Sequence, residues 1–212
     1  MVRRTKLEAL ETREQLLDAA ESVFRARGVG HASLAEVADA AGVTRGAIYH
    51  HFASKAELFE AMLARAEMPM DMAFDATRLP VADPLAMVRD MAVKALRHLA
   101  SCDRVRNIFE VAFLRCEYTD ELGPVEQRHL QERAQCLALS KGLLDQAVAR
   151  GQLPPDTDAR MASHMLYGFI GGLMRDWVQA PDTFDMNAAA PQAVDLFLAG
   201  LRTAPPRSPL SA

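Results

Sequence analysis

The chain has 212 residues, half of them hydrophobic, and a formal net charge of −4. That length and apolar content suffice for one compact core or two small ones. No apolar run is long enough to cross a bilayer, and the first residues lack the apolar core of a signal peptide. The composition therefore argues against a membrane-spanning protein, and we expect a cytoplasmic one.

Secondary-structure signals along the chain favour an all-α fold. Long amphipathic stretches recur, alternating runs of Val, Ile and Thr are scarce, and no turn signals separate short strands. The first predicted helix runs from Glu8 to Arg27 and ends at Gly28, with basic residues in its last turn, as the helix dipole favours. Its apolar face comprises Leu16, Leu17, Ala20, Val23 and Phe24.

A short basic arm precedes this helix and consists of Arg3, Arg4 and Lys6. Insertion into a DNA minor groove and a solvated tail are both open interpretations of such an arm. The arm matters because the net charge is negative, whereas affinity for nucleic acid depends largely on cations that neutralise phosphates. A DNA-binding function thus requires that the basic residues gather on one face of the protein.

The next segment, SLAEVADAAGVTRGAIYHHFASK, predicts two short helices joined by a glycine turn. Ser33 is a good N-cap for the first helix, and Glu36 three residues later completes a capping box. Gly42 suits a left-handed turn after that helix, and Thr44 caps a second helix that we expect to continue to His51. This arrangement is typical of a helix-turn-helix motif, whose second helix lies in the major groove of DNA.

Polar and basic side chains cover the predicted outer face of that second helix, while Ile48 and Phe52 are expected to point inward. The outer set offers hydroxyls, a guanidinium group, imidazoles and a methyl group, which together suit base edges and phosphates. Lys55 follows the N-cap Ser54 of the next helix, where it is placed to hold a phosphate. The outer residues are Thr44, Arg45, Ala47, Tyr49, His50 and His51.

Residues 9 to 60 resemble the N-terminal domain of the TetR family of transcriptional repressors, through ETREQLLDAAESVFRARG, SLAEVADAAGVTRGAIYHHF and SKAELFEAM. The resemblance implies a three-helix DNA-binding domain followed by a C-terminal helical domain for ligand binding and dimerisation. It also implies that Tyr49, His51 and Lys55 hold phosphates. By the same resemblance Thr44, Arg45, Ala47 and His50 face the groove, and Ser33 and Ala35 contact the backbone or flanking bases. His50 departs from close relatives, which often carry tryptophan there.

The rest of the chain predicts further helices and no internal repeat. A long fourth helix is expected from Ser54 to Leu79, with a kink or break at Pro69, because proline removes a backbone donor. Later helices are predicted over residues 83–100, 103–116, 124–150, 156–180 and 187–203. We therefore expect a DNA-binding domain over residues 1–55, a ligand-binding and dimerisation domain over 56–203, and a disordered tail over 204–212.

The C-terminal half is rich in methionine and aromatic residues, which suit either a plain core or a pocket that accepts several ligand shapes. It resembles the AcrR-like branch of the family, the repressors of multidrug efflux pumps, through FEVAFLRCEYTDEL, GQLPPD and GFIGGLMRDWVQAPDTFD. That resemblance implies a pocket for hydrophobic, often aromatic and cationic, compounds. It implies that Glu67 pairs with a cationic drug, and an exposed helix glutamate is the alternative interpretation. The other implied pocket residues are Phe109, Phe113, Cys136, Leu166, Tyr167, Ile170, Gly171 and Met174.

Dimerisation is predicted for the last two helices, because both carry apolar stripes that suit a four-helix interface across a two-fold axis. The first stripe comprises Met161, Met165, Phe169, Leu173 and Trp177, and the second comprises Val194, Phe197, Leu198 and Leu201. A single DNA-binding domain gives weak specificity. We therefore expect a homodimer on a palindromic double-stranded operator.

Enzymatic, metal-binding and redox functions find little support in the sequence. The chain has no glycine-rich phosphate loop, no nucleophile elbow and no His pair at metal-ligand spacing, so we expect no catalytic residue, cofactor or metal. Cys102, Cys116 and Cys136 lack metal or disulfide spacing and are expected to be reduced thiols. The main hypothesis is a drug-responsive repressor of an efflux operon. A repressor that responds to one metabolite, and a ligand-binding dimer without DNA binding, remain alternatives.

Overall fold

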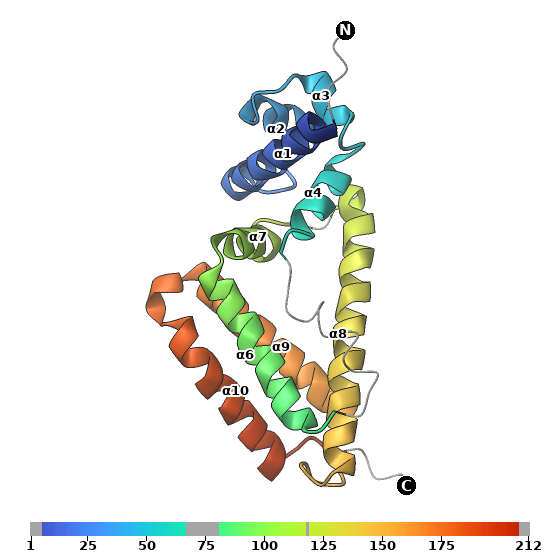
Figure 1. The fold of residues 1–212 in the computed structure, drawn as a ribbon, viewed down its shortest axis with the longest axis vertical. Helices are drawn as coiled ribbons and strands as arrows, with labels where there is room; N and C mark the ends of the chain where they lie inside the picture. Colours follow the sequence, from blue (N-terminus) through green and yellow to red (C-terminus); the bar gives the residue numbers. More distant parts are fainter. Residues whose placement is uncertain (1–5, 67–80, 118, 208–212) are drawn as a thin grey trace. The chain divides into compact units, whose positions relative to one another are not determined.

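The structure is a computed structural model and describes residues 6–66, 81–117 and 119–207. Within these ranges the regular secondary structure is helical apart from an isolated β-bridge between Thr157 and Arg207, which confirms the predicted all-α class (Figure 1). The contacts divide the described residues into two compact units. The N-terminal unit comprises residues 6–66 and 104–129, and the C-terminal unit comprises residues 81–103 and 130–207.

The first four helices of the N-terminal unit lie close to the predicted positions. They are α1 (Lys6–Arg27), α2 (Leu34–Ala40), α3 (Arg45–Tyr49) and α4 (Lys55–Leu63). The predicted N-caps are all present, because the side chains of Ser33, Thr44 and Ser54 accept backbone N–H bonds from Glu36, Ala47 and Glu57 respectively. Local capping chemistry thus determines where each of these three helices begins.

The ends of α3 and α4 differ from the prediction. The α3 helix stops at Tyr49 rather than continuing to His51, because the N–H groups of His50 and His51 bond to carbonyls three residues back and tighten the last turn. The α4 helix stops at Leu63, and Arg65 and Ala66 make the same kind of three-residue bond. The predicted continuation to Leu79, with its break at Pro69, lies outside the described residues.

Among the remaining elements the α-helices follow the predicted boundaries within a few residues, which is the usual uncertainty at helix ends, and the two short 3-10 helices were not predicted. They are α6 (Pro84–Ser101), α7 (Asp103–Leu114), the 3-10 helix η2 (Asp120–Leu122), α8 (Gly123–Ala149), α9 (Ala159–Gln179), the 3-10 helix η3 (Pro181–Thr183) and α10 (Met186–Thr203). Of the helices in these described ranges, none is long and apolar enough to cross a membrane.

The core of the N-terminal unit draws on two distant parts of the chain. Leu16, Phe24, Ile48 and Phe59 from the first four helices, and Phe52 from the turn between α3 and α4, are essentially inaccessible to solvent. The rings of Phe24 and Phe59 meet edge to face at 5.8 Å. The same core also contains Ile108 and Val111 of α7, Leu122 of η2 and Val125 of α8. The predicted domain boundary at residue 55 therefore does not coincide with the division of the packed units.

A backbone contact joins the turn after α1 to the end of α7. Gly28 has a φ of +81°, and a Cβ atom there would lie 3.3 Å from the carbonyl oxygen of Arg115. The N–H of the next residue, Val29, donates to that same oxygen at 2.9 Å. The left-handed conformation and the close approach both favour glycine, so the turn and α7 are held together at this point.

Ion pairs reinforce the packing of α1 against α4 and α7. The guanidinium group of Arg65 is largely buried and donates to Glu21 at 2.8 Å and to Asp18 at 2.5 Å. Burial raises the pKa of Glu21, and the nearby Arg65 opposes that rise. Arg25 of α1 also bonds to Glu110 of α7 at 2.9 Å. Arg65 thus neutralises carboxylates that would otherwise be left unpaired beside the core.

The C-terminal unit is built around the packing of α6 against α10. Val194, Leu198 and Leu201 of α10 are buried, as are Leu96 and Leu99 of α6. At the surface of this contact the guanidinium group of Arg89 makes two bonds to the carboxylate of Asp195, at 2.5 and 2.9 Å. The apolar stripe predicted for dimerisation on α10 is therefore used largely inside the unit.

The first residues of the predicted disordered tail are ordered. The carbonyl oxygen of Pro206 accepts a bond from the N–H of Asp158 at 2.7 Å, and Arg207 pairs with Asp156 at 2.9 Å. Pro205 is buried. Residues 204–207 thus pack against the turn that precedes α9, and the rest of the predicted tail lies outside the described residues.

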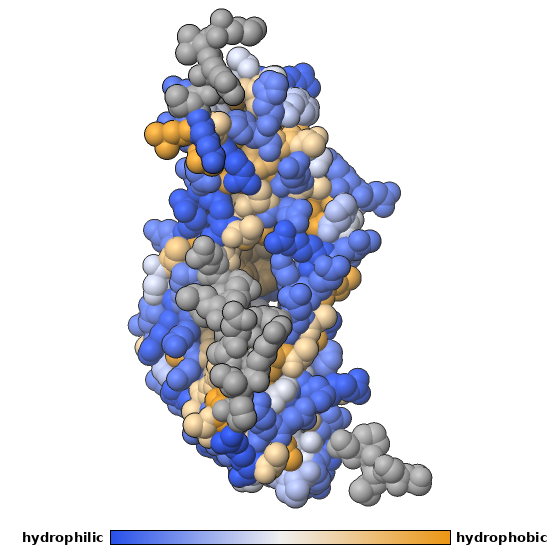
Figure 2. All heavy atoms as spheres, turned by 45° about the vertical axis from the view of Figure 1, so that its right-hand side comes forward, coloured by the Kyte–Doolittle hydropathy of each residue, from blue (hydrophilic) through white to orange (hydrophobic). Residues whose placement is uncertain are grey.

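The surface of the C-terminal unit retains exposed apolar side chains on α9 and α10. Met161, Met165 and Leu196 are exposed, and the rings of Phe169 and Phe197 stack at 5.2 Å between the two helices. Trp177, by contrast, is buried and donates to the carbonyl of Phe184 at 3.2 Å. The face drawn in Figure 2 is mostly hydrophilic, with hydrophobic side chains showing at separate places.

Replacement of Arg65 tests the α1–α4 ion network. We expect Arg65→Met to lower the free energy of unfolding by about 1–3 kcal/mol, because it leaves the buried carboxylate of Glu21 without its cation. Urea denaturation followed by circular dichroism measures the change. Lys141→Met is the matched control: it removes a lysine from an exposed pair with Asp145 and should cost roughly 0.5 kcal/mol or less. Equal losses in the two variants would contradict the prediction.

Candidate nucleic-acid interface

The turn between α2 and α3 gives the motif its geometry. Gly42 has a φ of +68°, and the N–H of Val43 bonds to the carbonyl of Ala38 at 3.0 Å. These features end α2 and redirect the chain within four residues, so that Thr44 caps α3. Ala38 and Ile48 are fully buried, which holds α3 against α2. The structure therefore confirms the predicted pair of short helices.

The outer side of α3 carries the polar side chains that the sequence predicts. Thr44, Arg45 and His50 are exposed, Tyr49 is 52% exposed, and Ala47 and His51 are half-buried. Ile48 and Phe52 point into the core, as predicted. Ser33 at the start of α2 is exposed and Ala35 is half-buried. The surface thus offers hydrogen-bonding groups on a helix whose opposite side is anchored, as direct contact with base edges requires.

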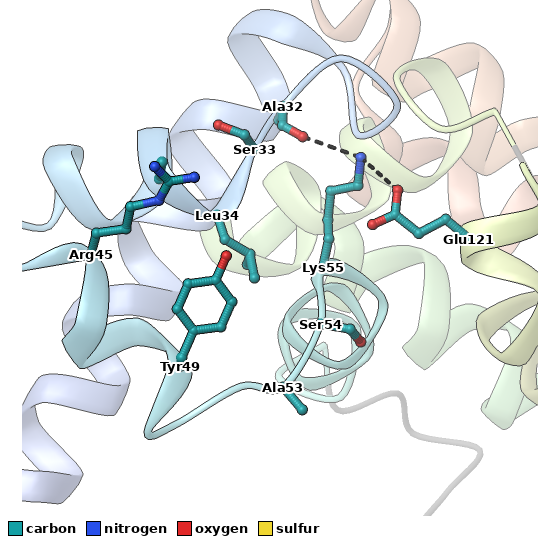
Figure 3. Close-up of a pocket in the computed structure, with 10 residues that line it drawn as sticks. Ala32, Ser33, Leu34, Arg45, Tyr49, Ala53, Ser54, Lys55 and Glu121 are labelled. Atoms are coloured by element: carbon teal, nitrogen blue, oxygen red, sulfur yellow. Dashed lines mark hydrogen bonds and ion pairs between the residues drawn. The ribbon is translucent and has the colours of Figure 1, made fainter.

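An open cavity of about 400 Å³ lies beside this surface. Figure 3 shows that Arg45 and Tyr49 of α3, Ser33 before α2, and Ser54 and Lys55 at the start of α4 surround it. Hydroxyl groups, a guanidinium group and an ammonium group are the donors that proteins use for phosphate oxygens. The other lining residues are Ala32, Leu34, Ala35, Ala53 and Glu121.

Lys55 differs from the freely extended phosphate ligand that its position in the sequence predicts. It is only 9% exposed, and its ammonium group donates to the carbonyls of Gly30 at 3.2 Å and Ala32 at 3.1 Å. A third contact, at 3.0 Å, joins its Nζ to a carboxylate oxygen of Glu121. The ammonium group still borders the cavity, but protein atoms already engage it. Its contact with DNA stays a prediction.

Glu121 is the charged cavity residue that sequence reasoning missed. It lies in η2, 66 positions beyond Lys55 in the chain. The buried side chain of its neighbour Leu122 anchors η2 in the N-terminal core, and η2 packs on α4. Nothing in the local pattern around Glu121 distinguishes it from other surface carboxylates. Only tertiary packing brings it to Lys55.

The residues predicted for a ligand pocket fall into two groups. Phe109 and Phe113 belong to the N-terminal unit, with ring centroids 5.1 Å apart. The C-terminal unit holds Cys136, Leu166, Tyr167, Ile170, Gly171 and Met174. Leu166 and Met174 are buried, whereas the other four are half-buried. Glu67 lies outside the described residues. The role of these residues in ligand binding stays a prediction.

Arg133 was not among the predicted pocket residues, yet it contacts one of them, Tyr167. Its guanidinium carbon is 5.5 Å from the ring centroid of Tyr167, which is the distance of a cation–π contact. Burial raises the pKa of Tyr167 and nearby Cys136 also raises it, while Arg133 lowers it. Tyr167 and Arg133 thus bring an aromatic ring, a hydroxyl group and a positive charge together.

The helix-turn-helix geometry and the polar outer side of α3 define the class of the protein: it is a helix-turn-helix DNA-binding protein. Comparison with known proteins gives the family. Residues 16–62 match the model of bacterial regulatory proteins of the tetR family, and residues 83–203 match the C-terminal region of MAATS-type transcriptional repressors. The chain belongs to the TetR family of transcription regulators.

Relatives match over nearly the whole chain. The HTH-type transcriptional regulator TtgR of Pseudomonas putida is 40% identical over 209 residues, which cover 97% of this chain and 98% of TtgR. NalD, the secondary repressor of the MexAB-OprM multidrug efflux pump in Pseudomonas aeruginosa, has a crystal structure with a TM-score of 0.85 and 34% identity, covering 94% of this chain and 100% of NalD. A complex of SmeT from Stenotrophomonas maltophilia with triclosan has a TM-score of 0.76 and 27% identity, covering 95% of this chain and 100% of SmeT.

Substitutions on α3 separate base recognition from backbone contact. Arg45→Ala should relax sequence preference by about 1–3 kcal/mol at one operator position, because a guanidinium group forms paired bonds to guanine. Tyr49→Phe keeps the ring and removes one hydroxyl, so it should weaken binding to every sequence by about 0.5–1.5 kcal/mol. Fluorescence anisotropy with single-base operator variants measures both effects. Equal loss on all sequences from Arg45→Ala would contradict its role in base recognition.

Proposed function

We propose that this protein is a cytoplasmic, homodimeric repressor that binds a palindromic operator and leaves it when a small hydrophobic or cationic compound binds the C-terminal half. We further propose that the operator controls a multidrug efflux operon. The observation that carries the proposal is the α2–α3 motif, in which Ile48 is buried while Arg45 and Tyr49 are exposed beside a cavity lined with phosphate-binding donors.

DNA binding follows from the distribution of charge rather than from its sum. The chain carries a net charge of −4, but the cavity beside α3 presents Arg45 and Lys55, and Lys6 begins α1. Arg3 and Arg4 of the predicted basic arm lie outside the described residues. Among the residues that line the cavity, cations and hydroxyls therefore outnumber the single carboxylate, Glu121, which is paired with Lys55.

The efflux and drug-binding parts of the proposal rest on the relatives and on the C-terminal unit. NalD represses a multidrug efflux pump, and SmeT binds triclosan, which is a hydrophobic phenol. In this chain Tyr167, Arg133 and the buried Met174 provide an aromatic ring, a cation and a flexible apolar side chain. Such a mixture favours apolar aromatic compounds that carry a polar group.

The exposed apolar side chains of α9 and α10 support a dimer. Met161, Met165 and Leu196 expose 41%, 48% and 75% of their surface, and a protein that keeps such residues on two adjacent helices gains free energy by covering them. A second copy of the same two helices completes a four-helix interface across a two-fold axis. The dimer then presents two copies of α3 to two half-sites one helical turn of DNA apart, about 34–36 Å.

A charge on this apolar surface should break the dimer. We expect Leu196→Glu to shift the protein from dimer to monomer and to weaken operator binding by about tenfold or more, because each half-site then binds alone. Sedimentation velocity measures the oligomeric state. Leu130→Glu is the matched control, since Leu130 is 53% exposed on α8. A dimer that survives Leu196→Glu, or dissociates only with Leu130→Glu, would place the interface elsewhere.

Binding to DNA from upstream of its own gene tests the whole proposal. Fluorescence anisotropy across a salt series should show specific binding that ethidium, triclosan or another apolar aromatic compound abolishes. Specific binding that no such compound affects would instead favour a repressor tuned to a single metabolite. Equal affinity for the upstream fragment and for a random duplex of the same length would contradict the repressor function.

A further inference from the structure

The three contacts of the Lys55 ammonium group differ in how readily they exchange. An ammonium group has three N–H donors, and the two carbonyls and Glu121 satisfy all of them. The carbonyls of Gly30 and Ala32 belong to the turn after α1, where Val29 is bonded to Arg115 and Ala32 to the carbonyl of Gly28. The Glu121 side chain is 52% exposed. It is therefore the partner that leaves at least cost.

Glu121 also occupies the side of Lys55 that faces the cavity. Its carboxylate lines the same cavity as Arg45 and Tyr49 and points at Lys55 from η2 (Figure 3). A phosphodiester and a carboxylate are both anionic oxygen acceptors, and an ammonium group with two donors fixed on carbonyls has one donor left for either. The two anions compete for that donor, and they repel each other.

We propose that Glu121 is an intramolecular counter-ion that a backbone phosphate of DNA displaces from Lys55. On binding, the Lys55–Glu121 pair breaks, a Lys55–phosphate pair forms, and the Glu121 carboxylate returns to water. Glu121 thus lowers the affinity for every DNA sequence, which raises the share of binding free energy that comes from base contacts. This inference rests on the proposed DNA-binding function and assigns to that site a residue that opposes binding.

The position of Glu121 makes the exchange accessible to regulation. Leu122 anchors η2 in the N-terminal core, and η2 runs directly into α8. The α8 helix contributes to both units, with residues through His129 in the N-terminal unit and residues from Leu130 onward in the C-terminal unit. A change in α8 that moves η2 also changes how firmly Glu121 holds Lys55.

The test compares Glu121→Gln with Asp120→Asn, which removes the same charge one residue away in η2. Binding is measured by fluorescence anisotropy on the upstream fragment and on a random duplex, from about 50 to 200 mM salt. We expect Glu121→Gln to raise affinity for both duplexes by the same factor, on the order of three- to tenfold at low salt. Its slope of log K against log salt should stay close to that of the wild type, since Lys55 neutralises the same phosphate in both complexes.

Asp120→Asn should change affinity by less than about twofold, through screened charge alone. In a Lys55→Gln background the gain from Glu121→Gln should fall to the level of Asp120→Asn. If the Lys55→Gln protein does not fold, the comparison of Glu121→Gln with Asp120→Asn by itself tests the proposal. An unchanged or weakened affinity in Glu121→Gln would overturn the proposal and would show that Glu121 only positions Lys55.

The outcomes separate this inference from the proposed function. If the wild-type protein prefers the upstream fragment and Glu121→Gln shows no gain in DNA affinity, the counter-ion proposal is wrong and the proposed repressor function still stands. A gain on both duplexes without any preference for the upstream fragment supports the counter-ion and contradicts the repressor. No DNA binding by the wild type or by Glu121→Gln overturns both.

Discussion

The burial of Ile48 and Phe52 in the N-terminal core is the constraint on which the DNA-binding surface depends. A helix of five residues, such as α3, is too short to be stable by itself in water. Its position comes from packing, and the core that holds it is completed by Ile108, Val111 and Leu122 from later in the chain. The presentation of Arg45 and Tyr49 is therefore a property of the whole unit rather than of the motif alone.

Because α7 and η2 contribute to that core, residues from the later part of the chain help to hold α3 in position. The contact of Arg115 with Val29 and the close approach at Gly28 hold α7 to the turn after α1. Phe109 and Phe113, which resemble pocket residues, lie on the same helix. The helix that carries these rings is thus tied, through the Arg115–Val29 bond, to the turn that leads into α2.

Two largely buried cations of this protein, Arg65 and Lys55, are paired with nearby carboxylates. Arg65 sits among carboxylates of α1, and Lys55 meets Glu121 beside the candidate phosphate site. The net free-energy cost of a partly buried charge is lower when the charge is paired than when its partner is missing. The ammonium group of Lys55 is therefore already paired with a carboxylate beside the candidate DNA-binding surface.

The sequence by itself determined the helical class, most helix boundaries and the outer side of α3, because caps such as Ser33 and Thr44, the Gly42 turn and the apolar spacing act within a few residues. It also indicated the family through motifs that span nearly the whole chain. Tertiary structure decided what depends on contacts between distant segments. It put α7 into the N-terminal core, buried Val194 and Leu198 against α6 instead of leaving them for a partner, and ordered Pro206 against Asp158. It also brought Glu121 to Lys55, since no local pattern encodes which of many surface carboxylates meets a given cation after folding.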